Sequence, residues 1–215
     1  MLYEDKLKNI HIEANDIKLG ENVTLSNNIH IKTFGKFHLG DGSHLGSNVN
    51  MKGNDIVIGK HFYYSPLNTL GLNVGGGGSD SPNSNLTVGD RCVFHNGLIN
   101  ICEPVVIGND VGLSNHVDII THGFWYSMLE GYPTEFAGVT IGNNVIVGWR
   151  STIMTGVEIS DNVVIGNNSN VVKSITKSKS IYVGNPARFI KKIEEPNTKV
   201  KLKMLDSIVE DFKDL

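Results

Sequence analysis

The side chains in this sequence that are best suited to proton transfer near neutral pH are its eight histidines. His122 follows Thr121 and precedes a loop rich in aromatic residues, and His116 lies six residues earlier. His95 is followed directly by Asn96. A histidine positioned as a general base typically contributes about 10²- to 10⁴-fold to a reaction rate. Which histidine could act in this way depends on the elements that position it.

A six-residue period organises the chain around these histidines. Large aliphatic residues recur at every sixth position of the segment 139–172, at Ile141, Val147, Ile153, Ile159, Ile165 and Val171. This period fits neither an amphipathic helix nor an alternating strand. Asn144, Asn162 and Asn168 each stand three places after one of them, and asparagine tolerates the left-handed backbone of a tight corner. Three flat sides of this kind close a triangular coil of about eighteen residues, and successive coils stack as parallel strands roughly 4.8 Å apart.

The same hexads begin near residue 10 and are interrupted twice, so we expect two loop excursions, at about 63–87 and at about 123–138. The first contains four consecutive glycines, Gly75 to Gly78. It lacks the Lys-Ser/Thr of a phosphate-binding loop, which favours a flexible excursion over a phosphate site. Long loops of this kind often line a substrate pocket.

A helical pattern replaces the hexads at the end of the chain. Leu205, Ile208, Val209 and Phe212 share one helical face. We therefore predict one coiled domain over residues 1–195 and a C-terminal helix over 196–215 that covers the open end of the coil.

Composition limits the compartment and the partners. The chain has 215 residues, 19 basic and 22 acidic, with a net charge of −3, which argues against a nucleic acid or a membrane surface as its main partner. It contains no signal-peptide core and no run long enough to span a bilayer, so we expect a soluble, cytoplasmic protein. Cys92 and Cys102 are ten residues apart, which does not favour a disulfide framework or a metal site. We place Cys92 in the core.

In three features taken together the chain resembles the hexapeptide-repeat acyltransferases, which include the maltose, galactoside, serine and xenobiotic acetyltransferases. They are the hexads, the Thr121-His122 pair ahead of a loop and the VTIGNN run, and the sequence VGNPAR at 183–188. The resemblance is firm over about 105–193. It implies an all-β, left-handed parallel β-helix, and a homotrimer that transfers an acyl group from acetyl-CoA or another acyl-CoA without a metal. The implied acceptor is a hydroxyl or amino group of a sugar, nucleotide sugar or polysaccharide, in surface-polysaccharide or nucleotide-sugar biosynthesis.

The resemblance and the hexad frame both single out His122. The family's catalytic histidine matches the Thr-His pair, and the frame puts His122 at an outward corner three places after Ile119. The alternative is a corner residue chosen only because histidine tolerates a left-handed backbone. His116 occupies the same place one hexad earlier, so we expect it at a different corner, where a structural role is favoured.

The remaining site residues are implied by the resemblance alone. The backbone amides of Gly148 and Trp149 match the place where the family polarises the thioester. Asn96, with His95, matches the family's acceptor-orienting asparagine, and its alternative is a simple corner turn. The cations that match the coenzyme A phosphates are Lys173, Arg188, Lys191 and Lys192.

Two other classes of protein share this coil. The γ-type carbonic anhydrases bind zinc between subunits, with a histidine pair five residues apart, whereas His116 and His122 are six apart. A non-catalytic structural coil would carry flat threonine ladders and few excursions. This chain has two large excursions and no such ladder.

Overall fold

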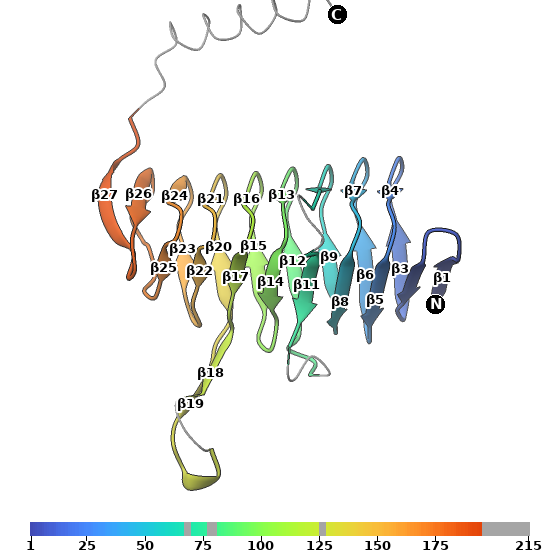
Figure 1. The fold of residues 1–215 in the computed structure, drawn as a ribbon, viewed down its shortest axis with the longest axis horizontal. Helices are drawn as coiled ribbons and strands as arrows, with labels where there is room; N and C mark the ends of the chain where they lie inside the picture. The colour runs from blue at the N-terminus through green and yellow to red at the C-terminus, as the bar shows by residue number, and fades with distance from the viewer. Residues whose placement is uncertain (67–69, 77–80, 125–127, 195–215) are drawn as a thin grey trace, which may run out of the picture.

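The computed structural model describes residues 1–66, 70–76, 81–124 and 128–194. These residues form three long parallel sheets, which we call A, B and C, wound into a single three-sided coil (Figure 1). The chain runs repeatedly from sheet A to sheet B to sheet C. The predicted all-β, parallel β-helix of hexapeptide repeats is confirmed.

Each sheet is built from short strands contributed by successive coils. Sheet A contains β1 Leu2–Asp5, β2 Ile10–Glu13, β5 Ile29–Thr33, β8 Val49–Gly53, β11 Leu72–Gly75, β14 Gly97–Asn100, β17 Val117–Ile119, β22 Thr152–Ile153 and β25 Asn170–Val171. Sheet B contains β3 Asp16–Leu19, β6 Lys36–Leu39, β9 Ile56–Ile58, β12 Leu86–Val88, β15 Val105–Ile107, β20 Val139–Ile141 and β23 Glu158–Ile159. Sheet C contains β4 Thr24–Leu25, β7 His44–Leu45, β10 Tyr63–Tyr64, β13 Val93–Phe94, β16 Gly112–Leu113, β21 Ile146–Val147, β24 Val163–Ile165, β26 Ser180–Val183 and β27 Arg188–Lys192.

The hexad residues behave as their spacing predicts. The aliphatic residue that leads each hexad is buried, as at Ile153 and Ile165, and Cys92 is likewise fully buried in this core. Asn144, Asn162 and Asn168 have φ values of 54°, 60° and 54°, the left-handed conformation that a tight corner requires. The period thus sets both the core and the corners.

Side-chain oxygens tie one coil to the next along the edge between sheets B and C. Asn109 Oδ1 accepts the backbone N–H of Asp90, Asn143 Oδ1 accepts that of Asn109, and Asp161 Oδ1 accepts that of Asn143. The distances are 2.7 to 2.9 Å. These bonds satisfy corner amides that the sheet ladders do not reach.

The first predicted excursion, 63–87, is wrong in part. Strand β11 lies inside it and pairs with β8 and β14 in register, burying Leu72 and Val74. The described residues of this segment therefore rejoin the coil at β11 instead of forming one uninterrupted excursion. A single four-residue strand is too short to show a six-residue period, so the hexad pattern does not reveal it.

The second excursion leaves the coil where predicted. Strands β18 His122–Phe124 and β19 Thr134–Phe136 form an antiparallel hairpin that contains the short 3₁₀ helix η1 Met128–Glu130. Figure 1 shows this hairpin and the loop between β11 and β12 projecting from the same edge of the coil. That edge is the corner where the chain passes from sheet A to sheet B, and we call it the A–B edge.

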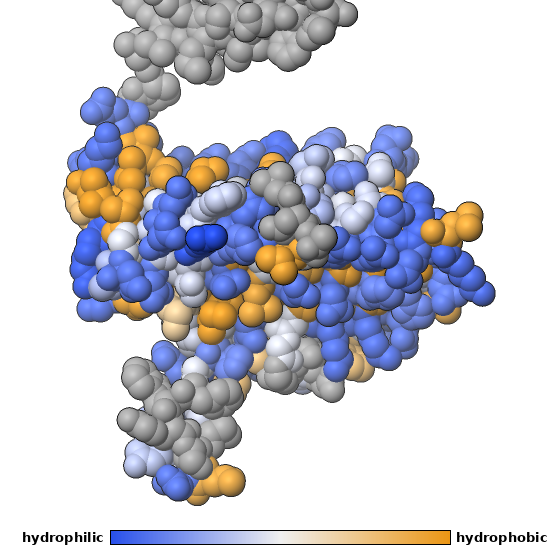
Figure 2. Space-filling view, in the orientation of Figure 1, coloured by the Kyte–Doolittle hydropathy of each residue, from blue (hydrophilic) through white to orange (hydrophobic). Residues whose placement is uncertain are grey.

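Both ends of the coil carry antiparallel strands. Strand β1 pairs antiparallel with β2 at the N-terminal end, and β27 pairs antiparallel with β26 at the other end. Figure 2 shows hydrophobic side chains gathered around this second hairpin, where Phe189 and Ile190 are exposed. The predicted helix over 196–215 lies outside the described residues, and no helix within them has the length and apolarity to cross a membrane.

Because side chains of β15 point alternately into and out of the core, substitutions at neighbouring residues should change the free energy of unfolding very differently. Ile107 is 1% exposed and Val106 is 43% exposed. Ile107→Ala should lower the free energy of unfolding by about 2–5 kcal/mol through lost burial and a cavity, whereas Val106→Ala should change it by less than about 0.5 kcal/mol. Urea unfolding followed by circular dichroism measures both. Equal losses for the two variants would contradict the inward and outward assignment.

Candidate active site

The excursions bring chemistry-bearing side chains together at the A–B edge. The loop after β11 and the β18–β19 hairpin leave this edge on either side of the short corner 101–104, which joins β14 to β15. Backbone bonds close the base of the hairpin, because Ala137 N–H donates to Thr121 O and Val139 N–H donates to Pro104 O. His122 and Asn100 therefore face each other from adjacent coils.

His122 is half-buried and its orientation is fixed by an amide. Its Nδ1 lies 3.1 Å from Asn100 Oδ1. A carbonyl oxygen only accepts hydrogen bonds, so Nδ1 must carry the proton, and the neutral imidazole holds its lone pair on Nε2. This is the tautomer of a general base whose Nε2 takes a proton. His122 is also the first residue of a strand rather than a left-handed corner residue, so the alternative interpretation does not apply to it.

Asn100 is held by bonds that also identify its oxygen. Thr121 Oγ1 donates to Oδ1 at 2.6 Å, and the backbone N–H of Cys102 donates to the same oxygen at 3.3 Å. Because an N–H donates only, the atom facing Cys102 is the carbonyl oxygen of the amide. Glu103 N–H in turn donates to Thr121 Oγ1 at 3.2 Å. Asn100 is 5% exposed and Thr121 is fully buried, so the support beneath His122 is rigid.

Two further residues shape the surroundings of the imidazole. The Phe136 ring stacks on His122 with centroids 5.8 Å apart and planes inclined by 20°. Gly76, the first residue after β11, approaches Asn100 so closely that a Cβ there would lie 2.2 Å from Asn100 Nδ2 and 3.2 Å from Cys102 Sγ. A side chain at position 76 would therefore displace the amide that orients His122.

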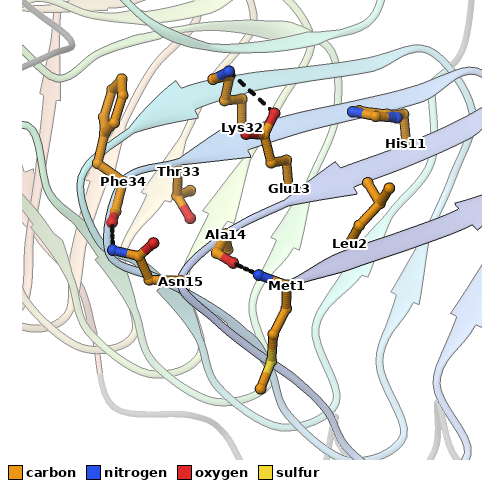
Figure 3. A pocket seen from close by; sticks show the side chains of 9 residues that line it. All are labelled: Met1, Leu2, His11, Glu13, Ala14, Asn15, Lys32, Thr33 and Phe34. Carbon is orange, nitrogen blue, oxygen red and sulfur yellow. Dashed lines mark hydrogen bonds and ion pairs between the residues drawn. The ribbon is translucent and has the colours of Figure 1, made fainter.

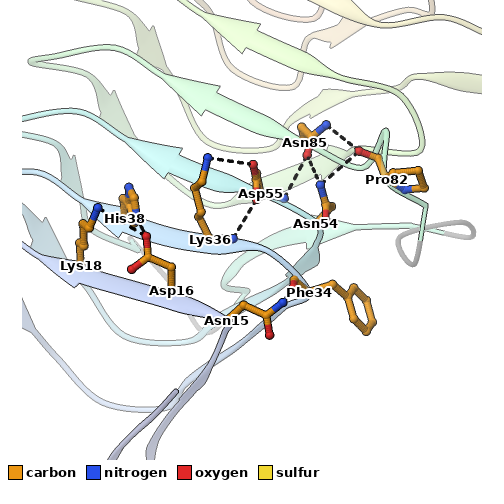
Figure 4. A network of polar contacts seen from close by, with 10 residues as sticks. All are labelled: Asn15, Asp16, Lys18, Phe34, Lys36, His38, Asn54, Asp55, Pro82 and Asn85. Carbon is orange, nitrogen blue, oxygen red and sulfur yellow. Dashed lines mark hydrogen bonds and ion pairs between the residues drawn. The ribbon is translucent and has the colours of Figure 1, made fainter.

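The return of the first excursion is anchored to the coil by an amide network (Figure 4). Asn54 Nδ2 donates to Asn85 Oδ1 at 3.0 Å and to Pro82 O at 3.2 Å. Asp55 N–H donates to the same Asn85 oxygen, and Asp55 is paired with Lys36. The described end of this loop is thus fixed at the A–B edge, one coil before the corner that carries Asn100.

The backbone amides of Gly148 and Trp149, which we expected to polarise the thioester, lie away from His122 and already donate hydrogen bonds within the coil. Gly148 and Trp149 follow β21, at the corner where the chain passes from sheet C to sheet A, which we call the C–A edge. Gly148 N–H donates to Ile165 O at 2.8 Å, and Trp149 N–H donates to Asn167 Oδ1 at 2.9 Å. Both amides complete the coil's own hydrogen bonds, so neither is available to an oxyanion within this chain.

Asn96, His95 and His116 also lie at the C–A edge rather than beside His122. His95 Nδ1 donates to Ser65 O at 2.8 Å, and His116 has a φ of 57°, which fits the predicted corner role. Asn96 directly precedes β14, the strand that Asn100 ends, and four residues of parallel strand span about 13 Å. The amide that contacts His122 is therefore that of Asn100, and the predicted contact of Asn96 with an acceptor stays a prediction.

The predicted cations fall into two groups. Lys173 is exposed and follows β25 at the A–B edge, two coils beyond His122. Arg188, Lys191 and Lys192 are exposed on β27, in the hairpin at the end of sheet C. Only Lys173 shares an edge of the coil with His122.

A large pocket at the N-terminal end of the coil is remote from this site. It has a volume of about 780 Å³ and lies between β1, β2 and β5 at the N-terminal end (Figure 3). Its charged side chains are paired, Lys32 with Glu13 and His11 with Glu4. We therefore place the candidate active site by its chemistry, at His122, rather than by pocket size.

Asn100 and Cys102 are the site residues that the hexads do not identify. The repeat slips by one residue near Asn100, so no hexad position predicts which way it points. The cysteine spacing gives no reason to place either thiol near the site, yet Cys102 borders it, because its backbone N–H donates to Asn100 Oδ1. No three His, Cys, Asp or Glu side chains among the described residues form a group that could hold a metal ion.

Comparisons with known proteins agree with the repeat. Residues 138–173 match the family model described as the hexapeptide repeat of succinyl-transferase, which confirms the predicted hexapeptide repeat. A comparison of the sequence with curated proteins finds no match.

Solved structures match a larger part of the chain than the family model does. A variant of AntD, an N-acyltransferase from Bacillus cereus in complex with dTDP and coenzyme A, is similar with a TM-score of 0.52 and 18% identity over 96% of this chain and 98% of that one. A hexapeptide-repeat acetyltransferase from Vibrio cholerae O1 biovar eltor, complexed with acetyl coenzyme A, has a TM-score of 0.50 and 18% identity over 73% of this chain and 71% of that one. At these identities the likeness concerns the fold.

The His122–Asn100 bond makes a prediction that needs no substrate. Long-range ¹H–¹⁵N NMR of the folded protein above the histidine titration range should show His122 protonated on Nδ1, because Asn100 Oδ1 accepts from that atom. A proton found on Nε2 would contradict the orientation of the base.

Proposed function

We propose that this chain is an acyl-CoA-dependent transferase, with acetyl the simplest acyl group, that acts on a hydroxyl or amino group of a sugar. The observation that carries the proposal is the His122–Asn100 pair at an edge of the coil bordered by two excursions. The hexapeptide repeat and the likeness to acyltransferases crystallised with coenzyme A support it. A cytoplasmic location, surface-polysaccharide or nucleotide-sugar biosynthesis, and the absence of a metal cofactor remain part of the prediction.

In the proposed reaction the acceptor attacks the thioester directly. His122 Nε2 takes the proton of the acceptor hydroxyl or amine as its oxygen or nitrogen bonds to the thioester carbonyl carbon. The C–S bond then breaks, and the imidazolium returns the proton to the departing thiolate. Asn100 is a positioning residue, because its Oδ1 holds Nδ1–H and stabilises the ring when it becomes positive.

A covalent acyl-enzyme is not needed in this scheme. Cys92 is fully buried in the core, and burial raises the pKa of its thiol. Cys102 borders the site but is 4% exposed. A direct transfer uses His122 alone as the proton carrier.

The donor is proposed to lie along the A–B edge between His122 and Lys173. Successive coils are spaced by about 4.8 Å, so two coils separate these residues by roughly 10 Å. Gly156 occupies the same edge in the coil between them, and it leaves room beside the backbone. Lys173 would contact a coenzyme A phosphate, and Arg188, Lys191 and Lys192 remain predicted contacts on the terminal hairpin.

We propose a homotrimer whose subunits meet through sheet C. The outward column of this sheet runs through Tyr63, Val93, Gly112, Ile146, Val164 and Ile181. Tyr63, Val93 and Ile146 are 46%, 41% and 47% exposed. The matching column of sheet A carries histidine, asparagine and aspartate around Leu98, and that of sheet B alternates valine with threonine. An exposed column of sheet C without a charged side chain from Tyr63 to Ile181 supports a surface that is covered in an assembly.

The mechanism predicts a large effect of one substitution. His122→Ala should lower turnover by roughly two to four decades, because the base is lost, while acetyl-CoA binding stays nearly unchanged. His11→Ala and His30→Ala, at the N-terminal end of sheet A, serve as controls and should retain the wild-type rate. A thiol-release assay with acetyl-CoA and a saturating acceptor measures turnover. If His122→Ala keeps most of its activity, the base assignment is wrong.

The assembly proposal predicts a mass of about 70 kDa in sedimentation, three times the 23.5 kDa chain. Ile146→Lys would bury a charge in the proposed interface and should shift the sample toward the monomer. Thr140→Lys, an outward substitution on sheet B, should leave the mass unchanged. A monomeric wild-type protein, or a trimer indifferent to Ile146→Lys, would contradict the sheet C interface.

A further inference from the structure

A second pocket lies on the outer face of sheet A, at the opposite end of the strands from His122. It has a volume of about 320 Å³ and lies at the C–A edge. The lining residues that matter here are Leu70, Asn73, Asn96, Leu98, His116 and Asp118. We call it the sheet A pocket.

Asn96 in this pocket carries an unsatisfied buried oxygen. Asn96 is 1% exposed, and its Oδ1 has no hydrogen-bond partner among the described residues. Further along this column Asn167 Oδ1 accepts the backbone N–H of Trp149, in the coil before it, whereas Asn115 Oδ1, like Asn96 Oδ1, has no partner among the described residues. The register places Pro66 opposite Asn96, and proline has no N–H to donate. A buried amide without its partner costs about 1–3 kcal/mol, and such groups call for an explanation such as a ligand.

The chemistry of the pocket suits a neutral, hydroxyl-bearing ring. Asn73, Asn96 and His116 offer amide and imidazole groups, and Asp118 offers a carboxylate whose Oδ1 already accepts Leu98 N–H at 3.1 Å. Leu70 and Leu98 are 57% and 38% exposed, which provides apolar surface for the C–H face of a sugar. No lysine or arginine lines it among the described residues. A phosphate would meet the carboxylate without a compensating cation.

The distance between this pocket and the base indicates an extended ligand. Asn96 directly precedes β14 and Asn100 ends it, four residues later, which corresponds to about 13 Å of parallel strand. On the next coil Asp118 lies in β17, and His122 begins β18 beyond the corner that follows. One pyranose ring is too short to reach both ends. A sugar bound at His122 reaches the pocket only through a second unit attached to it.

We infer that the acceptor is a saccharide of at least two sugar units, with the reacting unit at His122 and a neighbouring unit in the sheet A pocket. This inference rests on the proposed transferase function and narrows its acceptor to a glycan. A nucleoside-diphosphate sugar would place a charged pyrophosphate over Asp118, which the pocket disfavours.

The test offers each of three sugars as an acceptor in three forms. Methyl glycosides, disaccharides and UDP-sugars of glucose, galactose and N-acetylglucosamine are assayed with saturating acetyl-CoA for acceptor-dependent thiol release. The kcat/KM of the preferred disaccharide should exceed that of its methyl glycoside by about tenfold or more, and the matching UDP-sugar should gain nothing over the methyl glycoside.

Substitutions in the sheet A pocket test whether the preference for the disaccharide arises there. Asn73→Ala, and His116→Asn, which preserves the left-handed backbone at that position, should each lower kcat/KM for the disaccharide by about three- to tenfold and leave the methyl glycoside unaffected. Asn50→Ala is the matched control, because Asn50 pairs with Asn73 one coil earlier and does not line the pocket. It should change neither value.

The outcomes separate this inference from the function on which it rests. A preference for UDP-sugars, or pocket variants that lower the disaccharide and methyl glycoside values equally, would overturn the extended-glycan acceptor and leave the transferase standing. An absence of acceptor-dependent thiol release with every sugar would overturn both.

Discussion

The spacing of the stacked coils is the constraint on which the structure depends. Parallel strands lie about 4.8 Å apart, so any two residues at the same position of successive coils are near neighbours. A polar ladder forms at the B–C edge because Asn109, Asn143 and Asp161 repeat in register. The His122–Asn100 pair forms at the A–B edge for the same reason, since the coils that carry Asn100 and Thr121 are adjacent.

The site arises where the repeat is broken. In an uninterrupted coil the corner after β17 would turn directly into sheet B, and His122 would be an exposed corner residue. The β18–β19 hairpin instead carries the imidazole away from the corner and stacks Phe136 on it. The short corner 101–104 provides Cys102 N–H, which with Thr121 fixes the amide of Asn100. The hairpin and the corner thus determine which groups surround His122, while the coil holds these groups rigidly in place.

The sequence predicts the repeating part of the structure and misses what depends on contacts between coils. The hexads around Ile141 to Val171 define the core and the corners, and His116 is correctly placed at a different corner from His122. Asn100 is not predictable from the frame, because the repeat slips there and its partner lies one coil away. Because of the same slip, the frame does not show that Asn96 lies at the opposite end of β14 from Asn100. Gly148 and Trp149 match a family motif, but a motif does not reveal that their amides already bond within the coil.

The central claim is that His122 catalyses direct transfer of an acyl group from acyl-CoA to a sugar. A single-turnover experiment with acetyl-labelled acetyl-CoA, quenched at intervals and resolved by intact-mass and sugar analysis, tests it most directly. The account predicts that the label passes from coenzyme A to the saccharide and is never found on the protein. Label on Cys102 before it reaches the sugar, or label that is released only as acetate, would contradict it.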